Sequence, residues 1–546
     1  MLKLSDIRLT GRSGESGLRQ IASDVLGVPA SVIDELHIQK LSIDARRKPD
    51  VRFVYTLLVS LGDERMVLDR NPPNVSIYAP PERYAFPQLA GTGPNKPTVI
   101  VGTGPAGLFA SLCLAEAGVR CIILERGQPV ERRIGDVERF WCGKGLDTSS
   151  NVQFGEGGAG TFSDGKLTTG VNDKRIRFVL EQFVRFGAPD DILYLSKPHI
   201  GTDRLRGVVR AIRNRLIELG CDIRFGHRLA DIEISEGALH AITVETDGGS
   251  YSMESDTLIL APGNSARDTF EMLRQRGITL TAKDFSVGVR IEHLQRDIDT
   301  AQYGAETPLC ADLPASDYKL VVHLQPGAAE GGAIKRGRSV YSFCVCPGGQ
   351  VVAAASESGG VVSNGMSLYA RDGENTSGAL LVGVTADDFG HGALDGVEFQ
   401  RRLEREAYKA GGGDYRAPAQ LVGDFLEKRA STGCKRITPT YLPGVRFCNL
   451  WDVLPEFVCE ALRAALLDFA GRITGFADPD AVMTAVESRS SCPVRIVREE
   501  HETVGVRGIF PCGEGSGYAG GIISAAIDGI KAAEAACIKM AKMSAE

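Results

Sequence analysis

The feature that most constrains this chain is a glycine-rich turn between two apolar strands, within residues 98–127. The sequence there predicts a strand, a helix and a second strand, at residues 98–101, 105–118 and 119–124. The glycines of the turn follow the order G-x-G-x-x-G, at Gly102, Gly104 and Gly107. In a βαβ unit these glycines permit a tight turn, close approach of a pyrophosphate and close packing of the helix on the sheet. The sequence therefore predicts a dinucleotide site.

Residues beside the turn supply polar contacts that a dinucleotide needs. Pro105 and Ala106 begin the helix, whose free N–H groups and positive dipole end attract phosphate. Glu125 lies about 20 residues beyond the glycines, where a carboxylate accepts hydrogen bonds from ribose hydroxyls. Arg126 and Arg133, in the polar segment that follows, are further candidates for binding the cofactor.

Composition and charge narrow the classes of protein. The 546 residues carry a net charge of −7, so the chain as a whole lacks the basic field of a nucleic-acid-binding protein. The 13 cysteines include no C-x-x-C pair and the 8 histidines show no paired spacing, so neither a disulfide framework nor a metal site is expected. No apolar run reaches the ~18 residues of a membrane span, and no signal peptide is evident. A soluble, cytoplasmic protein is expected.

Patterns along the chain predict an α/β fold with a nucleotide-binding domain that is split in sequence. The expected parts are a β-α-β-β, ferredoxin-like domain at 1–90, a proline-rich linker at 91–97, a Rossmann-like nucleotide-binding domain at 98–281 and 481–546, and an inserted mixed α+β substrate domain at 282–480. The apolar strand at 257–263 and the strand and helix near the C-terminus would complete the nucleotide-binding sheet.

A second glycine-rich stretch, at residues 151–169, is expected to be a ligand loop. Four glycines within six residues prevent regular structure and expose backbone amides: Gly155, Gly157, Gly158 and Gly160. Ala159 lies among them, and Ser163, Asp164 and Lys166 add polar groups directly afterwards. We expect this loop to line the reactive side of the cofactor rather than its adenine end.

The first domain carries a basic cluster made of Arg46, Arg47, Lys48 and Arg52. One interpretation is a contact for phosphate, RNA or the dinucleotide, and the other is a solvated turn. Nucleic acid is not an expected partner, although this cluster leaves that possibility open.

Longer motifs connect the chain to a known family. They lie at residues 42–46, 155–168, 197–203, 343–349, 487–489, 493–495 and 513–522. On these motifs the chain resembles the glutathione-reductase-type FAD-binding superfamily and, more closely, the bacterial family of FAD-dependent dehydrogenases of largely unknown substrate. Val345 stands where that family usually has methionine, which is a conservative departure.

The resemblance implies one FAD, bound non-covalently in an extended pose. Glu514 would hold the ribityl hydroxyls, with Gly263 and Gly513 in the turns beside it. The amides of Gly520, Gly521 and Ile522, at the start of a helix, would face the pyrimidine side of the flavin. The helix dipole there favours the negative charge of a reduced flavin.

The reaction implied is hydride exchange between FAD and an organic small-molecule substrate, in a cleft between the nucleotide-binding and inserted domains. Only one nucleotide fingerprint is present, so NAD(P)H would dock transiently as a reductant rather than occupy a domain of its own. The alternative is a flavin-bearing module that binds RNA or protein through its first domain.

Four residues are candidates for catalysis. His199 lies in a polar loop and is suited to proton transfer near neutral pH, and Lys166 could face a flavin or substrate oxygen. Cys344 and Cys346 stand at i and i+2, on one side of a predicted strand, and could carry electrons. Two sulfurs of one strand are poorly placed to bond, so a core role stays open for both. Arg489 and Arg495 are candidates for binding an anionic group.

Overall fold

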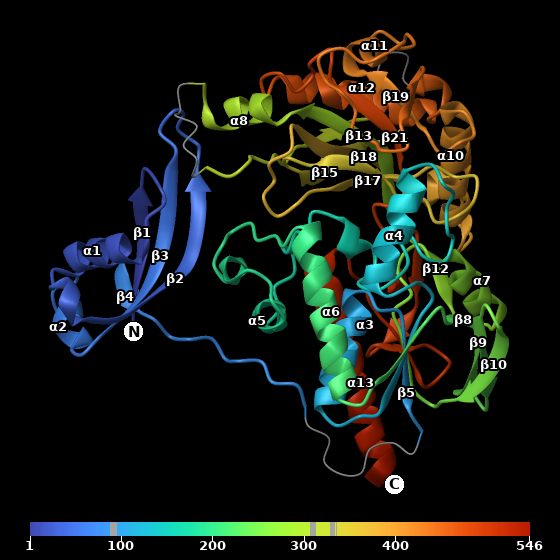
Figure 1. The fold of residues 1–546 in the computed structure, drawn as a ribbon, viewed down its shortest axis with the longest axis horizontal. Helices are drawn as coiled ribbons and strands as arrows, with labels where there is room; N and C mark the ends of the chain where they lie inside the picture. Colours follow the sequence, from blue (N-terminus) through green and yellow to red (C-terminus); the bar gives the residue numbers. More distant parts are fainter. Residues whose placement is uncertain (88–95, 306–312, 328–333, 335, 546) are drawn as a thin grey trace.

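A computed structural model describes residues 1–87, 96–305, 313–327, 334 and 336–545 (Figure 1). The predicted strand, helix and strand appear as β5 (Thr98–Val101), α3 (Pro105–Glu116) and β6 (Cys121–Glu125). They belong to a parallel sheet of order β25-β11-β5-β6-β7, completed by β7 (Asp222–Phe225), β11 (Leu258–Leu260) and β25 (Ile509–Pro511). Residues 106–115 of α3 are all buried, so this helix lies inside the domain.

Helices and a small antiparallel sheet surround the parallel sheet. α6 (Thr202–Glu218) and α13 (Ile522–Ala545) lie beside α3 (Figure 1). The approach of α13 requires Gly529, because a Cβ there would lie 2.0 Å from the carbonyl oxygen of Ala106. The remaining elements of this domain are α4 (Val130–Trp141), α5 (Arg175–Arg185), α7 (Arg267–Gln275), β8 (Arg228–Ser235), β9 (Ala238–Thr246) and β10 (Gly249–Glu254).

The inserted domain is built on a seven-stranded sheet of order β14-β15-β18-β13-β21-β19-β20. Its strands are β13 (Phe285–Leu294), β14 (Val321–Leu324), β15 (Arg338–Cys346), β18 (Asn375–Val384), β19 (Ala417–Leu421), β20 (Val445–Phe447) and β21 (Val482–Glu487). Its other elements are α8 (Gln295–Tyr303), β16 (Gln350–Ala353), β17 (Ser363–Met366), α9 (Ala386–Phe389), α10 (Asp395–Gly411), α11 (Val422–Leu426) and α12 (Glu456–Ala470). Every residue of the central strand β13 is buried.

The boundary expected at residue 481 differs from the structure. β21 lies between β13 and β19, so it belongs to the inserted domain's sheet. The chain then returns through β22 (Val494–Ile496), which pairs with β12 (Leu280–Ala282). β21 and β22 are short strands of six and three residues, so sequence pattern alone does not tell which sheet each one joins.

The first domain has the strand order β2-β3-β1-β4, with antiparallel neighbours, which is the ferredoxin-like arrangement. Its elements are β1 (Leu2–Leu9), α1 (Glu15–Leu26), β2 (Ile33–Asp44), β3 (Arg52–Leu61), α2 (Glu64–Leu68) and β4 (Val75–Ile77). The first four agree with the β-α-β-β order predicted from the sequence, whereas α2 and β4 are too short to give a periodic signal. β2 contacts the nucleotide-binding domain through a bridge between Leu41 and Leu195.

The segment that follows β4, at residues 78–87, packs partly on the nucleotide-binding domain. Tyr84 and Phe86 contact the core around α3 and α13. The hydroxyl of Tyr84 donates to Glu534 of α13 at 2.5 Å, and its ring packs on Phe178 of α5. Of the linker predicted at 91–97, residues 91–95 lie outside the described residues.

Candidate functional site

Four turns, drawn from distant parts of the sequence, meet at the carboxyl edge of the parallel sheet. A Cβ on Gly158 would lie 2.9 Å from the Cα of Gly104, so the loop at 155–160 rests directly on the glycine turn. A Cβ on Gly513 would lie 2.8 Å from the Cβ of Ala106, and one on Gly515 would lie 2.5 Å from the carbonyl oxygen of Gly263. This edge is where α/β sheets bind their ligands.

The start of α3 fits a pyrophosphate. Its N-cap is Gly104, no side chain caps it, and Pro105 occupies the first helical position. A helix end inside a protein needs partners for its free N–H groups, and an anion supplies them. Gly107 permits the tight turn, since a Cβ there would lie 1.8 Å from the carbonyl oxygen of Gly102.

Glu125 differs from its expected role as a ribose ligand. Its carboxylate is buried and accepts four hydrogen bonds from the protein itself. The donors are the amide and hydroxyl of Thr103, at 2.9 and 2.6 Å, and the amides of Gly127 and Gly155, at 2.9 and 3.1 Å. In this structure Glu125 therefore joins the glycine turn to the glycine loop.

Arg126 and Arg133 also serve the protein rather than facing a cofactor. Arg126 pairs with Asp268 at 3.0 Å and lies 4.2 Å from the centre of the Phe154 ring. Arg133 is fully buried and donates to five backbone carbonyls, those of Asn151, Val152, Gly155, Glu156 and Gly158. Burial lowers the pKa of Arg133 to about 10, so it remains charged at neutral pH. Arg133 thus fixes the shape of the glycine loop.

The glycine loop divides into two halves with different surroundings. Gly157 donates its amide to the carbonyl oxygen of Thr103 at 2.9 Å, so the first half lies at the glycine turn, contrary to the expectation for the whole loop. Gly160 lies against Ile522, because a Cβ on it would lie 3.2 Å from that side chain. Only the second half, from residue 159 onward, runs toward the start of α13 and the inserted domain.

Two polar residues of the second half are engaged by the protein. The hydroxyl of Ser163 donates to the carbonyl oxygen of Gly160 at 2.7 Å. Asp164 is buried and pairs with Arg371, whose Nε lies 3.0 Å away, and it accepts a hydrogen bond from Ser367. Although burial opposes ionisation, Arg371 and Lys166 hold the pKa of Asp164 below its ordinary value. Neither residue is placed as a free cofactor ligand.

Glu514 and the start of α13 lie side by side at this edge of the parallel sheet. Glu514 accepts a hydrogen bond from the side-chain amide of Asn264 at 2.8 Å, and burial raises its pKa to about 7. Gly520 and Gly521 are exposed immediately before Ile522 begins the helix. The amide of Gly520 donates to the hydroxyl of Ser524 at 3.1 Å, and the amide of Gly521 interacts with the Glu514 carboxyl group. This end therefore gathers amides and a carboxyl group, a donor and acceptor set of the kind that suits ribityl hydroxyls and a flavin pyrimidine.

Three of the four catalytic candidates, Lys166, Cys344 and Cys346, lie together at the end of β15 in the large sheet. Lys166 donates through Nζ to the carbonyl oxygen of Val345, between Cys344 and Cys346. Arg290 of β13 and Glu487 of β21 join this group, 3.2 Å apart, and both are buried. Burial raises the pKa of Glu487 to about 7. Arg290 was not among the residues predicted from the sequence.

His199 lies close to this group but is held by the backbone. Its Nε2 donates to the carbonyl oxygen of Tyr369 at 3.0 Å, and its ring stacks on the Tyr369 ring at 5.3 Å. Burial, with Arg371 nearby, lowers the pKa of His199, so the neutral form prevails near pH 7. Its backbone pairs with that of Lys166, which ties the two candidates together.

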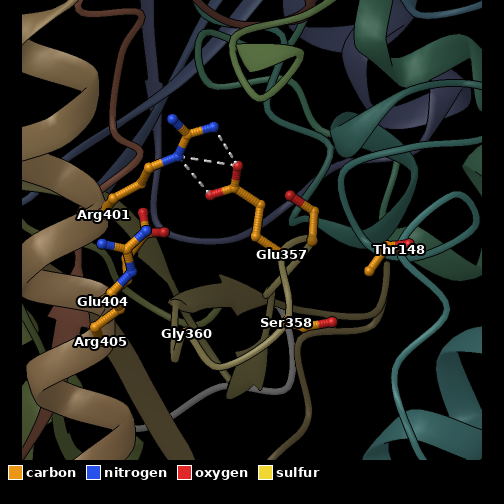
Figure 2. Close-up of a pocket in the computed structure, with 8 residues that line it drawn as sticks. Thr148, Glu357, Ser358, Gly360, Arg401, Glu404 and Arg405 are labelled. Carbon is orange, nitrogen blue, oxygen red and sulfur yellow. Dashed lines mark hydrogen bonds and ion pairs between the residues drawn. The ribbon is translucent and has the colours of Figure 1, made fainter. Parts of the chain in front are cut away.

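A polar pocket of about 360 Å³ lies between α10 and the loop after β16 (Figure 2). Arg401 donates to Glu357 at the wall of the pocket through hydrogen bonds of 2.8–3.3 Å, and Thr148 lies on another wall (Figure 2). Behind it, Arg489 donates to Glu404 at 2.8 and 3.0 Å, so its charge is matched within the protein. Arg489 is therefore not free to bind an anionic ligand, contrary to the expectation from the sequence. Arg495 is exposed and lies 4.9 Å from the centre of the Tyr518 ring.

The basic cluster of the first domain is largely paired. Arg46 lies 2.6 Å from Asp44, Arg52 lies 2.6 Å from Asp50, and Lys48 donates to the carbonyl oxygen of Ala301 in α8. These contacts favour the solvated-turn interpretation.

Within the described ranges, no group of three or more His, Cys, Asp or Glu could hold a metal ion. In the same part of the chain, no helix is long and apolar enough to cross a membrane.

Comparison with known proteins gives three family matches. Residues 95–133 match the FAD binding domain, residues 284–490 match the C-terminal domain-like region of FAD-dependent proteins, and residues 1–60 match a domain of unknown function. The first match covers the glycine turn and the second covers the seven-stranded sheet. Together they show an FAD-binding flavoprotein, and they do not establish the glutathione-reductase type or the dehydrogenase subtype expected from the sequence.

One curated relative matches over nearly the full length. It is described as an "Uncharacterized protein" of Clostridium beijerinckii, and the two are 44% identical over 537 residues, 98% of each chain. Solved structures are more distant. The flavin-dependent brominase Bmp2 is 14% identical, with a TM-score of 0.37 over 83% of this chain and 80% of that one. A geranylgeranyl bacteriochlorophyll reductase-like protein of Thermoplasma acidophilum is 10% identical, with a TM-score of 0.36 over 83% and 82%.

Proposed function

This chain belongs to the same family as the Clostridium beijerinckii protein, and from that premise we propose that it is an FAD-dependent oxidoreductase acting on an organic small molecule. The observation that carries the proposal is the course of the glycine loop. Its first half rests on the glycine turn, and its second half delivers Lys166 to the edge of the inserted domain's sheet. A cofactor lying along this loop would reach from the nucleotide turn to a cluster of ionisable groups.

The chain's own residues would hold FAD from both ends. The uncapped start of α3 would bind the pyrophosphate, and Glu514 and the amides of Gly520 and Gly521 would bind the ribityl and pyrimidine ends. When bound, FAD supplies a two-electron acceptor and donor for hydride transfer. Glu125 would contribute by keeping the glycine turn and glycine loop together.

The groups beside the loop suit proton handling and substrate binding. Lys166 is half-buried and positively charged, and it would bind a substrate oxygen or an anionic group. Glu487, whose pKa lies near neutral, could hold or release a proton at its carboxyl oxygens. His199 would orient Lys166 through the backbone pairing rather than act on substrate itself.

The electron partner is a further part of the proposal. We propose that NAD(P)H docks transiently as reductant, because the sequence has only one nucleotide fingerprint. We also propose that the protein acts in the cytoplasm on a small molecule, without nucleic acid, since the basic cluster is largely paired internally.

The first test is spectroscopic. Purified protein should show flavin absorbance, and denaturation should release FAD, since attachment is non-covalent. Under anaerobic conditions, NADH, NADPH and small-molecule donors are screened for bleaching of the flavin. We expect Lys166→Ala to retain FAD but to slow bleaching by the best donor roughly 10–100-fold. Lys174→Ala, an exposed residue of the same segment, serves as control. Protein that neither carries nor takes up FAD would contradict the proposal.

A further inference from the structure

Cys344 and Cys346 lie in a β-bulge, not in a regular strand. Phe343 pairs with Ala379 of β18, and the next paired residue, Cys346, faces Ser377, so β15 contains one extra residue. Cys344 takes up the irregularity with a φ of +39°, in the left-handed region that non-glycine residues seldom occupy. The expectation from a regular i and i+2 spacing therefore does not apply.

The bulge brings the two cysteines toward each other. The Sγ of Cys346 donates to the carbonyl oxygen of Cys344 at 3.3 Å, so its thiol lies directly beside residue 344. The fit around them is close, because a Cβ on Gly365 would lie 2.9 Å from the Sγ of Cys346. The pair is thus closely packed at the end of β15.

Positive groups surround this pair. Arg290 donates to the carbonyl oxygen of Cys344 from two nitrogens, each at 3.2 Å, and lies 3.9 Å from the Sγ of Cys346. Lys166 binds the peptide carbonyl between the two cysteines. The negative groups nearby are Glu487, which pairs with Arg290, and Asp164, which pairs with Arg371. Asp164 is thereby neutralised, and burial favours the neutral form of Glu487.

The two thiols are not equivalent. Cys344 is partly exposed and Cys346 is buried. The hydrogen bond from Cys346, against the opposing effect of burial and with the help of Lys166 and Arg290, lowers the pKa of Cys344 to about 6. The same hydrogen bond and burial raise the pKa of Cys346 well above its ordinary value. An accessible thiolate beside a buried neutral thiol is the arrangement of an attacking and a resolving cysteine.

We propose that Cys344 and Cys346 form a redox-active dithiol that converts reversibly to a disulfide, with the bound flavin as its two-electron oxidant. The proposal rests on the proposed function for that oxidant. The Cys344 thiolate and the Cys346 thiol together lose two electrons and one proton as the S–S bond forms. The oxidised flavin gains the same two electrons and that proton and becomes the reduced anion. Mass and charge balance without a further reagent.

The test uses holoprotein and counts electrons. Anaerobic reductive titration of air-oxidised wild type should consume about four electron equivalents per flavin, because flavin and disulfide each take about two. Cys346→Ser should consume about two, and so should Cys344→Ser. Cys434→Ser, at an exposed cysteine, should match wild type. Wild type that consumes about two equivalents would overturn the dithiol while leaving the flavin proposal intact.

A second measurement needs neither folded variants nor flavin reduction. Wild-type protein is equilibrated in glutathione redox buffers, alkylated with iodoacetamide and digested. The mass of the peptide that carries both cysteines is then measured by mass spectrometry. We expect alkylation of Cys344 and Cys346 to disappear together as the buffer becomes oxidising. If both remain alkylated under conditions that form other protein disulfides, the pair is not redox-active. If no flavin is bound yet the disulfide forms, the proposed function fails and the dithiol needs another oxidant.

Discussion

Replacing Arg133 with methionine should unfold the glycine loop and weaken FAD retention. Arg133 is among the largest fully buried side chains of the protein, and its guanidinium is the donor for five backbone carbonyls of residues 151–158. Methionine fills much of the same volume without any donor. The substitution therefore tests the hydrogen bonds more than the packing.

The structure sets the size of the effect. A buried carbonyl left without a donor costs about 1–3 kcal/mol, so five would give ~5–15 kcal/mol if nothing relaxed. The loop contains Gly155 and Gly158, which allow it to move and admit water. We therefore expect the free energy of unfolding to fall by about 3–5 kcal/mol, the usual cost of removing one partner from a buried charged network. Arg133→Lys should recover part of it, because an ammonium has only three donors.

The assay is urea unfolding followed by the fluorescence of released flavin, which reports on this domain directly. Arg132→Met is the matched control, since Arg132 is the exposed neighbour on the same helix. We expect Arg133→Met to release flavin at clearly lower urea than Arg132→Met, with Arg133→Lys between them. Equal midpoints for the two methionine variants would refute the idea that Arg133 holds the loop.

Three further predictions concern other parts of the site. Gly158→Val should abolish FAD uptake, because residue 158 has a φ of +65° and a Cβ would lie 2.9 Å from Gly104; normal flavin absorbance would contradict this. Glu404→Gln should cost about 3–5 kcal/mol near pH 7, measured by urea unfolding, because Arg267 and Arg489 lose their buried partner. The pKa of Glu404 is lowered on folding, so its contribution is present above its ordinary pKa and lost as the pH falls; the gap should narrow below about pH 4.5. Alkylation of Cys344 by iodoacetamide should be half-maximal near pH 6, and a midpoint near the ordinary thiol value of about 8.5 would show that its neighbours do not stabilise the thiolate.

The sequence predicted the parts of the fold that depend on local pattern. The strand, glycine turn and helix at residues 98–116 were identified because each glycine has a steric reason that is independent of the rest of the chain. The hydrogen-bond partners of Glu125 were not predicted, because Gly155 reaches it from 30 residues further along the chain.

In the candidate site, too, contacts between distant parts of the chain could not be predicted from local sequence pattern. Arg290 stands in an apolar strand between Val289 and Ile291, and a charge at a buried strand position was the signal that could have identified it. The bulge at Cys344 had no such signal, because it depends on the register between β15 and β18. Regular periodicity therefore predicted the correct strand but not the bulge between its two cysteines.

The pairing of Arg267 with Glu404 has a mechanical consequence. Arg267 belongs to α7 of the nucleotide-binding domain and Glu404 to α10 of the inserted domain, and both are buried, so this bond crosses the junction. Swinging the domains apart would separate the pair and also break the hydrogen bond from Arg267 to Gln400 of α10. The neck of paired strands β12 and β22 would also have to bend. A hinge-like opening would therefore be rare, and substrate traffic would depend on smaller displacements of surface loops.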